Sequence, residues 1–341
     1  MNRTATISFS FKAALASTLG GILLTAGATT ALADYPERPL TMVVAAGPGG
    51  SNDRAARVMS NFLAEELGQP VNVVNRPGGG NLLGHEYLRQ QAADGYTLLR
   101  TTAIPYMTIN QELQGASFTI EDFQPLNLVD IDTSMIASST RGDYDSIDDL
   151  IAAISDNPGS VSMGVQPTSS DMINATLFLE AIGLSVDDVR VVTFDGGGDV
   201  RTGVAGNQFD FGVVGEAGLR QMSSEIEPLM TFSREPMSDV WDAPHVLEVV
   251  DQHGVEDYPH VLSGSIRGYF VHYELMEEEP ERYARLVEAF ENIANNPEAI
   301  EAHHEQDLTI DWMGPEASRE MMLQEHESLA RPEFLQIVQP D

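Results

Sequence analysis

The stretch VVAAGPGGSNDRAAR (residues 43–57) passes from an apolar run through a glycine-rich turn directly into a helical pattern. Apolar residues recur at helical spacing from Asn52 until Gly68, so we predict a strand over 40–46 and a helix behind it. Glycines let a ligand approach the backbone, and the first N–H groups of a helix favour an anion. Taken alone, the turn fits a purely structural connection equally well.

The turn lacks the signatures of nucleotide binding. Asn52 stands where the third glycine of G-x-G-x-x-G belongs, and the only lysine of the chain is Lys12, so no Gly-Lys-Ser/Thr loop exists. A small carboxylate is therefore the better candidate for the anion.

The N-terminus has the pattern of a secretory signal peptide. Arg3 and Lys12 precede the apolar stretch 13–32, and Ala31-Leu32-Ala33 gives a small-residue cleavage site. An uncleaved membrane anchor is the alternative, but glycine, serine and threonine dilute the stretch. We therefore expect residues 1–33 to be a cleavable signal and the mature protein to be periplasmic.

Composition excludes several classes of protein. The 341 residues include no cysteine, which removes disulfides, thiol nucleophiles and Cys-ligated zinc. Lys+Arg is 18 against 52 Asp+Glu, a formal net charge of −34. Nucleic acid and anionic membranes are poor partners for such a field. Because the acids are scattered and molar salt screens their repulsion, we interpret the charge as halophilic adaptation.

Strand-like and helical runs alternate along the chain, which is typical of an α/β fold with parallel sheets. The first unit has strands at 40–46, 71–75 and within 94–102, with helices at 52–67 and 82–93. The second has helices at 146–154 and 170–181, strands at 160–165, 189–194 and 209–214, and a helix after DGGGD. The tail beyond Glu279 is predicted to be helical and to complete the first unit.

Ligands of open α/β sheets bind at the carboxyl ends of the strands, beside helix N-termini. Four loops are predicted to lie there: Gly47–Asp53, Gly78–Asn81, Gln166–Asp171 and Asp195–Asp199, with Thr101–Pro105 a weaker fifth. Two come from each unit, apart from the fifth, so they are expected to face one another.

Catalytic and metal-binding patterns are weak. No G-x-S-x-G elbow or H-E-x-x-H spacing occurs. We interpret His303, His304 and His326 as a solvated face of one acidic helix, and His85 and His272 as packed or surface residues. The chain is thus expected not to be an enzyme and to need no metal or cofactor. An exported hydrolase or lyase acting on a small organic acid remains the alternative.

Four segments in order resemble one family: YPERPLTMVVAAGPGGSNDRAARVM, LGQPVNVVNRPGGGNLLG, ADGYTLL and FDGGGDVRTGVAGNQFDFGVV. They are similar to the solute-binding proteins of tripartite tricarboxylate transporters, the Bug or TctC-like family, from Tyr35 to about Met230. The C-terminal third fits more loosely.

The resemblance implies a two-domain periplasmic-binding-protein (Venus flytrap) fold with a ligand cleft between the domains. It implies capture of a di- or tricarboxylate or an aromatic carboxylate by a monomer, and delivery to the membrane subunits of the transporter. A binding protein that serves signalling rather than uptake is an alternative that the sequence leaves open. Residues 34–128 plus 233–341 are predicted to form domain 1, and 129–232 domain 2, with crossings near Leu126–Ile131 and Leu229–Arg234.

The resemblance also implies which loop residues hold the ligand. The predicted contacts are Ala46, Gly47, Gly49, Gly50, Ser51, Asn52, Asp53, Asn81, Thr102, Gln166, Thr168, Ser169, Ser170, Asp195, Gly196, Gly197 and Glu216. Asp171 departs from the family pattern, because it would repel a second carboxylate unless it caps its helix. Arg201 is interpreted either as a charge partner of the ligand or, more simply, as a surface arginine.

Overall fold

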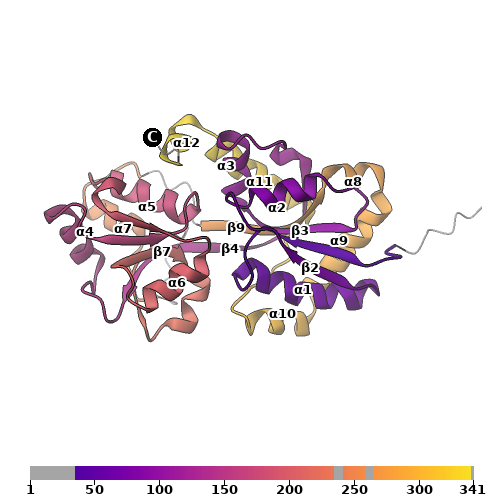
Figure 1. Ribbon diagram of the computed structural model, residues 1–341, viewed down its shortest axis with the longest axis horizontal. Helices are drawn as coiled ribbons and strands as arrows, with labels where there is room; N and C mark the ends of the chain where they lie inside the picture. Colours follow the sequence, from indigo (N-terminus) through magenta and orange to yellow (C-terminus); the bar gives the residue numbers. More distant parts are fainter. Residues whose placement is uncertain (1–34, 234–240, 259–263, 339–341) are drawn as a thin grey trace, which may run out of the picture. The chain divides into compact units, whose positions relative to one another are not determined.

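A computed structural model of the chain describes residues 35–233, 241–258 and 264–338 (Figure 1). Tyr35–Asp341 form one compact unit. The predicted signal peptide, residues 1–33, lies outside the described residues. Within the described ranges, no helix combines the length and apolar character needed to cross a bilayer.

The first predicted unit is confirmed as strand, helix, strand, helix, strand. Its elements are β1 (Leu40–Val44), α1 (Ser51–Leu67), β2 (Val71–Asn75), α2 (Leu82–Arg89) and β3 (Thr97–Ile104). Strand β1 pairs in parallel with β2 on one side and β3 on the other. Helix α1 ends at Gly68, whose φ of 69° is the left-handed conformation that glycine adopts most easily.

The second predicted unit is also confirmed. It consists of α4 (Ile147–Asp156), β5 (Ser162–Val165), α5 (Ser170–Ala181), β6 (Arg190–Thr193), α6 (Gly197–Ala205) and β7 (Phe211–Gly215). Strand β5 pairs in parallel with β6 and β7. Helix α6 begins inside the glycine triplet, so Gly197 and Gly198 form its first turn.

Two long antiparallel strands connect these units. They are β4 (Phe123–Ser139) and β9 (Gly264–His272), and the strand order is β2-β1-β3-β9-β4-β7-β5-β6 with β8 (Ile226–Thr231) also on β4. Residues 123–133 of β4 pair with β9, whereas residues 134–139 pair with β7 and β8. One strand therefore belongs to both halves of the curled sheet.

Other helices cover the sheet (Figure 1). They are α3 (Tyr106–Leu113), α7 (Val246–Gln252), α8 (Tyr273–Glu278), α9 (Pro280–Ala294), α10 (Pro297–His304), α11 (Pro315–Leu329) and α12 (Pro332–Val338). Short 3₁₀ turns are η1 (Ile120–Asp122), η2 (Val186–Asp188), η3 (Glu216–Gly218) and η4 (Arg220–Met222). The predicted helical tail is confirmed, but it consists of several helices.

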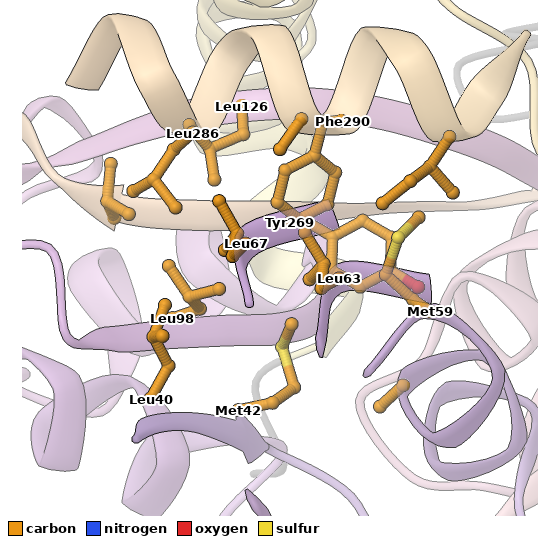
Figure 2. Packing of buried hydrophobic residues seen from close by; sticks show 14 of the residues in the cluster. Leu40, Met42, Met59, Leu63, Leu67, Leu98, Leu126, Tyr269, Leu286 and Phe290 are labelled. Carbon is orange, nitrogen blue, oxygen red and sulfur yellow. The ribbon is translucent and has the colours of Figure 1, made fainter. Parts of the chain in front are cut away.

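Alternation along the strands fills a core on each face of the sheet. Leu40 and Met42 of β1 pack against Met59 and Leu63 of α1 and Phe290 of α9 (Figure 2). The intervening Val43 lies in a separate cluster on the opposite face, with residues of α3 and α11. Both faces of a central parallel strand are thus buried, as its unbroken apolar sequence requires.

The chain re-enters the first half of the sheet later than the sequence suggested. Strand β8 pairs with β4, and α7 packs with Val161 and Phe211 in the core of the second unit. The return is made by β9, which pairs with β3. The division into domains at 128/129 and 232/233 remains a prediction, and this packing favours placing α7 with the second unit.

A buried charge network lies where β3, β9 and β4 run side by side. Asp130 accepts hydrogen bonds from Arg100 Nη2 and Arg267 Nη1, each at 3.2 Å. Arg267 also donates to Asp132, whose other oxygen accepts the N–H of Ala217 at 3.1 Å. Burial opposes the charge on Arg267, but Asp132 and Asp130 outweigh it and raise the pKa of the guanidinium.

This network predicts a large stability loss for Asp130→Asn. The variant leaves Arg100, which has no exposed surface, without its carboxylate. Breaking one partner of a buried pair typically costs about 3–5 kcal/mol of unfolding free energy. The matched control is Asp94→Asn, which breaks the exposed pair with Arg38 and is expected to cost less than about 1 kcal/mol. Urea unfolding at fixed salt measures both, and equal losses would contradict the prediction.

Candidate functional site

The loop after β1 is fastened by Asp53. Its carboxylate accepts the Gly49 N–H at 2.8 Å, two bonds from Arg57 and one from Asn75. Asn75 also donates to the carbonyl of Ala46 at 3.0 Å. Burial raises the pKa of Asp53, but these hydrogen bonds outweigh it and the net shift is downward. Asp53 therefore shapes the loop, since its oxygens already have partners.

The rest of this loop presents free backbone donors. Gly50 is the N-cap of α1 and supplies no side-chain cap, so the N–H groups of Ser51 and Asn52 have no intrahelical acceptor. Gly47 and Ser51 are partly exposed. Asn52 donates from Nδ2 to Thr102 Oγ1 at 3.0 Å, while its Oδ1 atom is buried without a hydrogen-bond partner.

The Gly78–Asn81 loop is held by a buried histidine network. Gly78, Gly79, Gly80 and Asn81 all have positive φ, a run that only glycine-rich sequence allows. The Asn81 amide reaches Thr101 Oγ1 at 3.3 Å. Asn110 donates its amide to the carbonyl of Gly80 at 3.0 Å.

The same network sets the protonation of His85. The Asn110 Oδ1 atom lies 2.7 Å from His85 Nδ1, so Nδ1 must donate. Nε2 then accepts from Thr101 Oγ1 at 2.8 Å. Burial lowers the pKa of His85 to about 4, and His85 is therefore neutral and structural, as predicted for a packed histidine.

The loop from Gln166 to Ser169 approaches the glycine loop of the first unit. Thr168 has a φ of 57°, which is uncommon for a β-branched residue and costs backbone energy. A Cβ atom placed on Gly80 would lie 3.1 Å from Thr168 Oγ1. Predicted site loops of the two units are therefore in van der Waals reach of each other.

Serines anchor the start of α5. Ser169 caps it by accepting the Met172 N–H at 3.1 Å, and it donates to the Gln166 carbonyl at 2.6 Å. Ser170 contacts Ser265 of β9 at 2.7 Å between hydroxyl oxygens. This bond joins the second unit to the strand that returns to the first.

Asp171 is buried next to the charge network. Ser134 Oγ donates to it at 2.7 Å. Burial raises the pKa of Asp171 to about 7, with a further upward contribution from the charge of Asp132 and opposing ones from Arg267 and Arg201. Burial thus disfavours the charged form of Asp171, which weakens its repulsion of a carboxylate.

The loop Asp195–Asp199 brings Arg201 into the interior. Asp195 is exposed, Gly196 is the uncapped N-cap of α6, and Gly197 lies against the guanidinium of Arg201. Arg201 is only 5% exposed. Its interpretation as a surface arginine is therefore wrong.

Glu216 follows β7, and its side chain is hydrogen-bonded to Arg220 and Trp241. Its carboxylate accepts two bonds from Arg220 at 3.0 Å and one from the Trp241 indole N–H at 3.0 Å. Both carboxylate oxygens of Glu216 therefore already have partners within the protein, although Glu216 is among the predicted ligand contacts.

Sequence reasoning missed three residues that the fold brings to these loops. Arg54 lies on α1 directly after Asp53, and Ser134 and Ser265 come from β4 and β9. Arg54 had a detectable signal, because a cation in the first turn of a helix is unfavourable beside the positive end of the helix dipole. The two serines had none, since neither strand was predicted.

The C-terminal histidines correct another expectation. His303 and His304 lie on α10 and His326 on α11, so they do not share one helix. His303 is 1% exposed and its Nδ1 lies 2.7 Å from the carbonyl of Ala299, so it is not on a solvated face. Across residues 35–233, 241–258 and 264–338, no cluster of three or more acidic or histidine residues could hold a metal ion.

Solved structures with similar folds define the class of protein. The chain aligns with the periplasmic binding protein BugD at 21% identity, with a TM-score of 0.70, over 89% of this chain and 97% of that one. It aligns with MatC of Rhodopseudomonas palustris at 17% identity and a TM-score of 0.71, over 89% and 100%. The fold is thus that of two-domain periplasmic solute-binding proteins, as predicted.

Sequence comparison identifies the family. Residues 55–215 match the model of the tripartite tricarboxylate transporter family receptor, TctC. Protein BugT of Bordetella pertussis is 36% identical over 160 residues, which are 46% of this chain and 49% of BugT. The matched stretch therefore spans about half the length of that relative. Over these residues the chain matches the TctC family, and the predicted resemblance is confirmed.

His85 gives a pH-dependent prediction. Its pKa of about 4 in the native state lies below the usual 6.5, so the unfolded chain binds this proton first as the pH falls. His85 should therefore cost stability progressively below pH 6.5, amounting to roughly 2–3 kcal/mol of unfolding free energy at pH 4.5.

The measurement is urea unfolding from pH 7.5 to 4.5 for the wild type and His85→Gln. The variant should lose less stability on acidification, whatever its stability at pH 7.5. His304→Gln, which removes an exposed histidine, is the control and should follow the wild-type slope. A slope unchanged in His85→Gln would show that the histidine is not held neutral.

Proposed function

We propose that this protein is an extracytoplasmic receptor that captures a small organic carboxylate and delivers it to a tripartite tricarboxylate-type membrane transporter. The family match and the proximity of loops from the two α/β units support this. Related folds are described with adipate, for a protein of R. palustris, and with bound malate, for MatC. Both ligands are small acids.

The observation that carries the proposal is the supply of unpaired donors at the strand ends. Helices α1 and α6 begin without a side-chain cap, at Gly50 and Gly196. Helix α2 also lacks a side-chain cap, but the N–H groups of Leu82 and Leu83 donate to the carbonyls of Gly79 and Gly78. Helices α4, α5 and α10 are capped by Ser146, Ser169 and Asn296, whereas α3, α8, α9 and α11 also begin without a side-chain cap. An uncapped helix start can bind a carboxylate through its N–H groups.

In this proposal Asn52 adds a side-chain donor when its amide is flipped, because in the structure Nδ2 donates to Thr102 Oγ1 and Oδ1 is the atom without a partner. A threonine hydroxyl can donate or accept, so the amide of Asn52 can contact Thr102 through its oxygen as well as through its nitrogen. In that orientation the buried atom without a partner is the NH₂ group. Such a donor is satisfied by a carboxylate oxygen of the ligand.

We assign two kinds of role to the predicted site residues. Backbone and side-chain donors of the loops contact the acid: Ala46, Gly47, Gly50, Ser51, Asn52, Asn81, Thr102, Gln166, Thr168, Ser170, Gly196 and Gly197. Asp53, through the Gly49 N–H, and Ser169, through α5, hold loop shape. Asp195 and Glu216 are not needed in direct contact, since one is exposed and the other is already bonded.

Short-range binding suits the charge of the chain. A formal charge of −34 cannot attract an anion from a distance, so affinity must come from preorganised donors. Each charge-assisted hydrogen bond contributes about 1.5–3 kcal/mol, so four or five contribute about 6–15 kcal/mol before entropic costs, a range that includes the roughly 8 kcal/mol of micromolar binding.

The wider role follows the same proposal. Residues 1–33 direct export to the periplasm and are removed, and two domains close around the ligand at the crossing strands. The receptor acts as a monomer without a cofactor, and it binds without turnover rather than acting as a hydrolase or lyase. The scattered acids adapt it to high salt.

Thermal unfolding against a panel of acids tests the proposal. Purified protein is unfolded, dialysed and refolded to remove bound ligand, then heated in molar salt with succinate, malate, citrate, adipate, terephthalate or glucose. An acid at about 100 times its Kd should add roughly 2.7 kcal/mol and raise Tm by a few degrees. Glucose should not. A panel that stays flat would contradict carboxylate binding, and product formation would contradict a receptor.

The variant Gly50→Asp should separate binding from folding. Gly50 has φ −71° and ψ 169°, so a side chain there meets no backbone strain, and its Cβ would lie 3.7 Å from the Gly47 carbonyl. Aspartate is a good N-cap, so Tm without ligand should hold or rise. The new carboxylate competes for the N–H groups that bind the acid, and calorimetry should detect at least a 100-fold loss of affinity.

Gly50→Asn is the matched control, because it has nearly the same shape without the charge. It should lose less affinity than Gly50→Asp. If both variants bind the acid as the wild type does, the start of α1 is not part of the site.

A further inference from the structure

Arg201 is a buried cation that lacks a counter-ion. Its guanidinium is on α6, 5% exposed, and its one hydrogen bond, from Nη1 to the Gly215 carbonyl, is long at 3.5 Å. It forms no ion pair with any residue of the ranges 35–233, 241–258 and 264–338. Burying an arginine in this state costs stability.

The surrounding backbone is shaped to admit this side chain. A Cβ atom on Gly218 would lie 2.4 Å from Arg201 Nε, and one on Gly197 would lie 3.4 Å from Nη1. Glycine at 218 therefore lets η3 approach the guanidinium, and Gly197 brings the first turn of α6 against it. The arginine is held in place by backbone rather than by a carboxylate.

Arg54 brings a second cation from the first unit. It is half-buried and donates to the carbonyls of Gly49 at 3.1 Å and Gln306 at 3.4 Å. It too makes no ion pair with a described residue. Burial lowers the pKa of Arg201, the charge of Asp132 raises it, and the charges of Arg267 and Arg54 lower it. The guanidinium groups of Arg54 and Arg201 therefore lie within electrostatic range.

Nearby carboxylates do not neutralise this pair. Asp132 acts on Arg201 electrostatically but is hydrogen-bonded to Arg267, as is Asp130, and burial raises the pKa of Asp171, which disfavours its charged form. A chain with 52 acidic and 18 basic residues does not lack partners for an arginine. Two unpaired arginines beside the predicted binding loops therefore indicate that the missing negative charge comes from outside the chain.

We propose that Arg201 and Arg54, one from each α/β unit, bind the second anionic group of the ligand and so make the protein selective for dianions. This inference rests on the proposed function, in which the loop N–H groups hold the first carboxylate. A guanidinium suits the task, because its planar donors match a carboxylate in two parallel hydrogen bonds. The two arginines repel each other until a dianion lies between them.

Titration calorimetry with matched acids tests this. Tyr35–Asp341 is freed of ligand by unfolding and refolding, then titrated with succinate against butyrate and with adipate against hexanoate, pairs of equal carbon number. The wild type should bind the better diacid at least 100-fold more tightly than its monoacid. Arg201→Gln should weaken the diacid at least 30-fold and the monoacid less than threefold, and Arg54→Gln should act in the same direction.

Arg190→Gln is the control, since it removes one exposed arginine of the second unit and should change neither affinity. The Tm of the ligand-free variants distinguishes a ligand-binding role of Arg201 from a structural one, because loss of a structural arginine would lower Tm. Because Arg201 is buried without a counter-ion, Arg201→Gln should keep or raise Tm. A lower Tm with unchanged preference for the diacid would overturn the proposal.

The remaining outcomes separate the two proposals. If the wild type binds no acid of these pairs and none of the acids in the thermal panel, the proposed receptor function fails. If it binds diacid and monoacid equally, only the role of the arginines fails. If Arg201→Gln weakens both acids by the same factor, Arg201 belongs to the first carboxylate site and dianion selection is overturned.

Discussion

The ion pairs of Arg267 link the strands that connect the two α/β units. Arg267 lies on β9, one of the two long antiparallel strands, and its two aspartate partners are both on β4. Asp130 also binds Arg100 of β3, while Asp132 accepts the N–H of Ala217 beside β7. The network therefore extends from the parallel strands of the first unit to the end of the second.

Arg267 and Arg201 are both buried, but they differ in how their charges are balanced. Arg267 pairs with two carboxylates, whereas Arg201 forms no ion pair with a carboxylate of the described residues. The first arrangement stabilises the fold without a ligand, and the second leaves a charge to be matched. A protein with a strongly negative surface thus keeps its unmatched positive charge inside, where water and salt screen it least.

Local signals predicted the parallel units well. Strand β2 begins and ends where the sequence indicated, and α1 ends at Gly68, because apolar periodicity and glycine act within a few residues. Strands β4 and β9 were not predicted. Their polar residues, such as Asp130, Asp132 and Arg267, are tolerated in a buried sheet only because they meet across strands far apart in the sequence. That compensation has no local signature.

The same distinction applies to the candidate site. Glycine loops marked where the strands end, so their placement was predictable from the sequence. The sequence did not predict which side chains are free to contact a ligand. Asp53 and Glu216 are hydrogen-bonded to Arg57 and Arg220, four residues further along the chain, and the backbone of η3 covers Arg201. Side-chain direction depends on packing that only the folded chain supplies.

Strand β4 limits how the two units can be recombined. Because its first eleven residues pair with β9 and its last six with β7 and β8, a junction between residues 128 and 129 falls inside a continuous hydrogen-bonded ladder. A chimera joined there must match the register of strands from both parents at once. Exchange of ligand specificity between relatives is therefore easier by replacing the loops at the strand ends than by swapping whole units as cassettes.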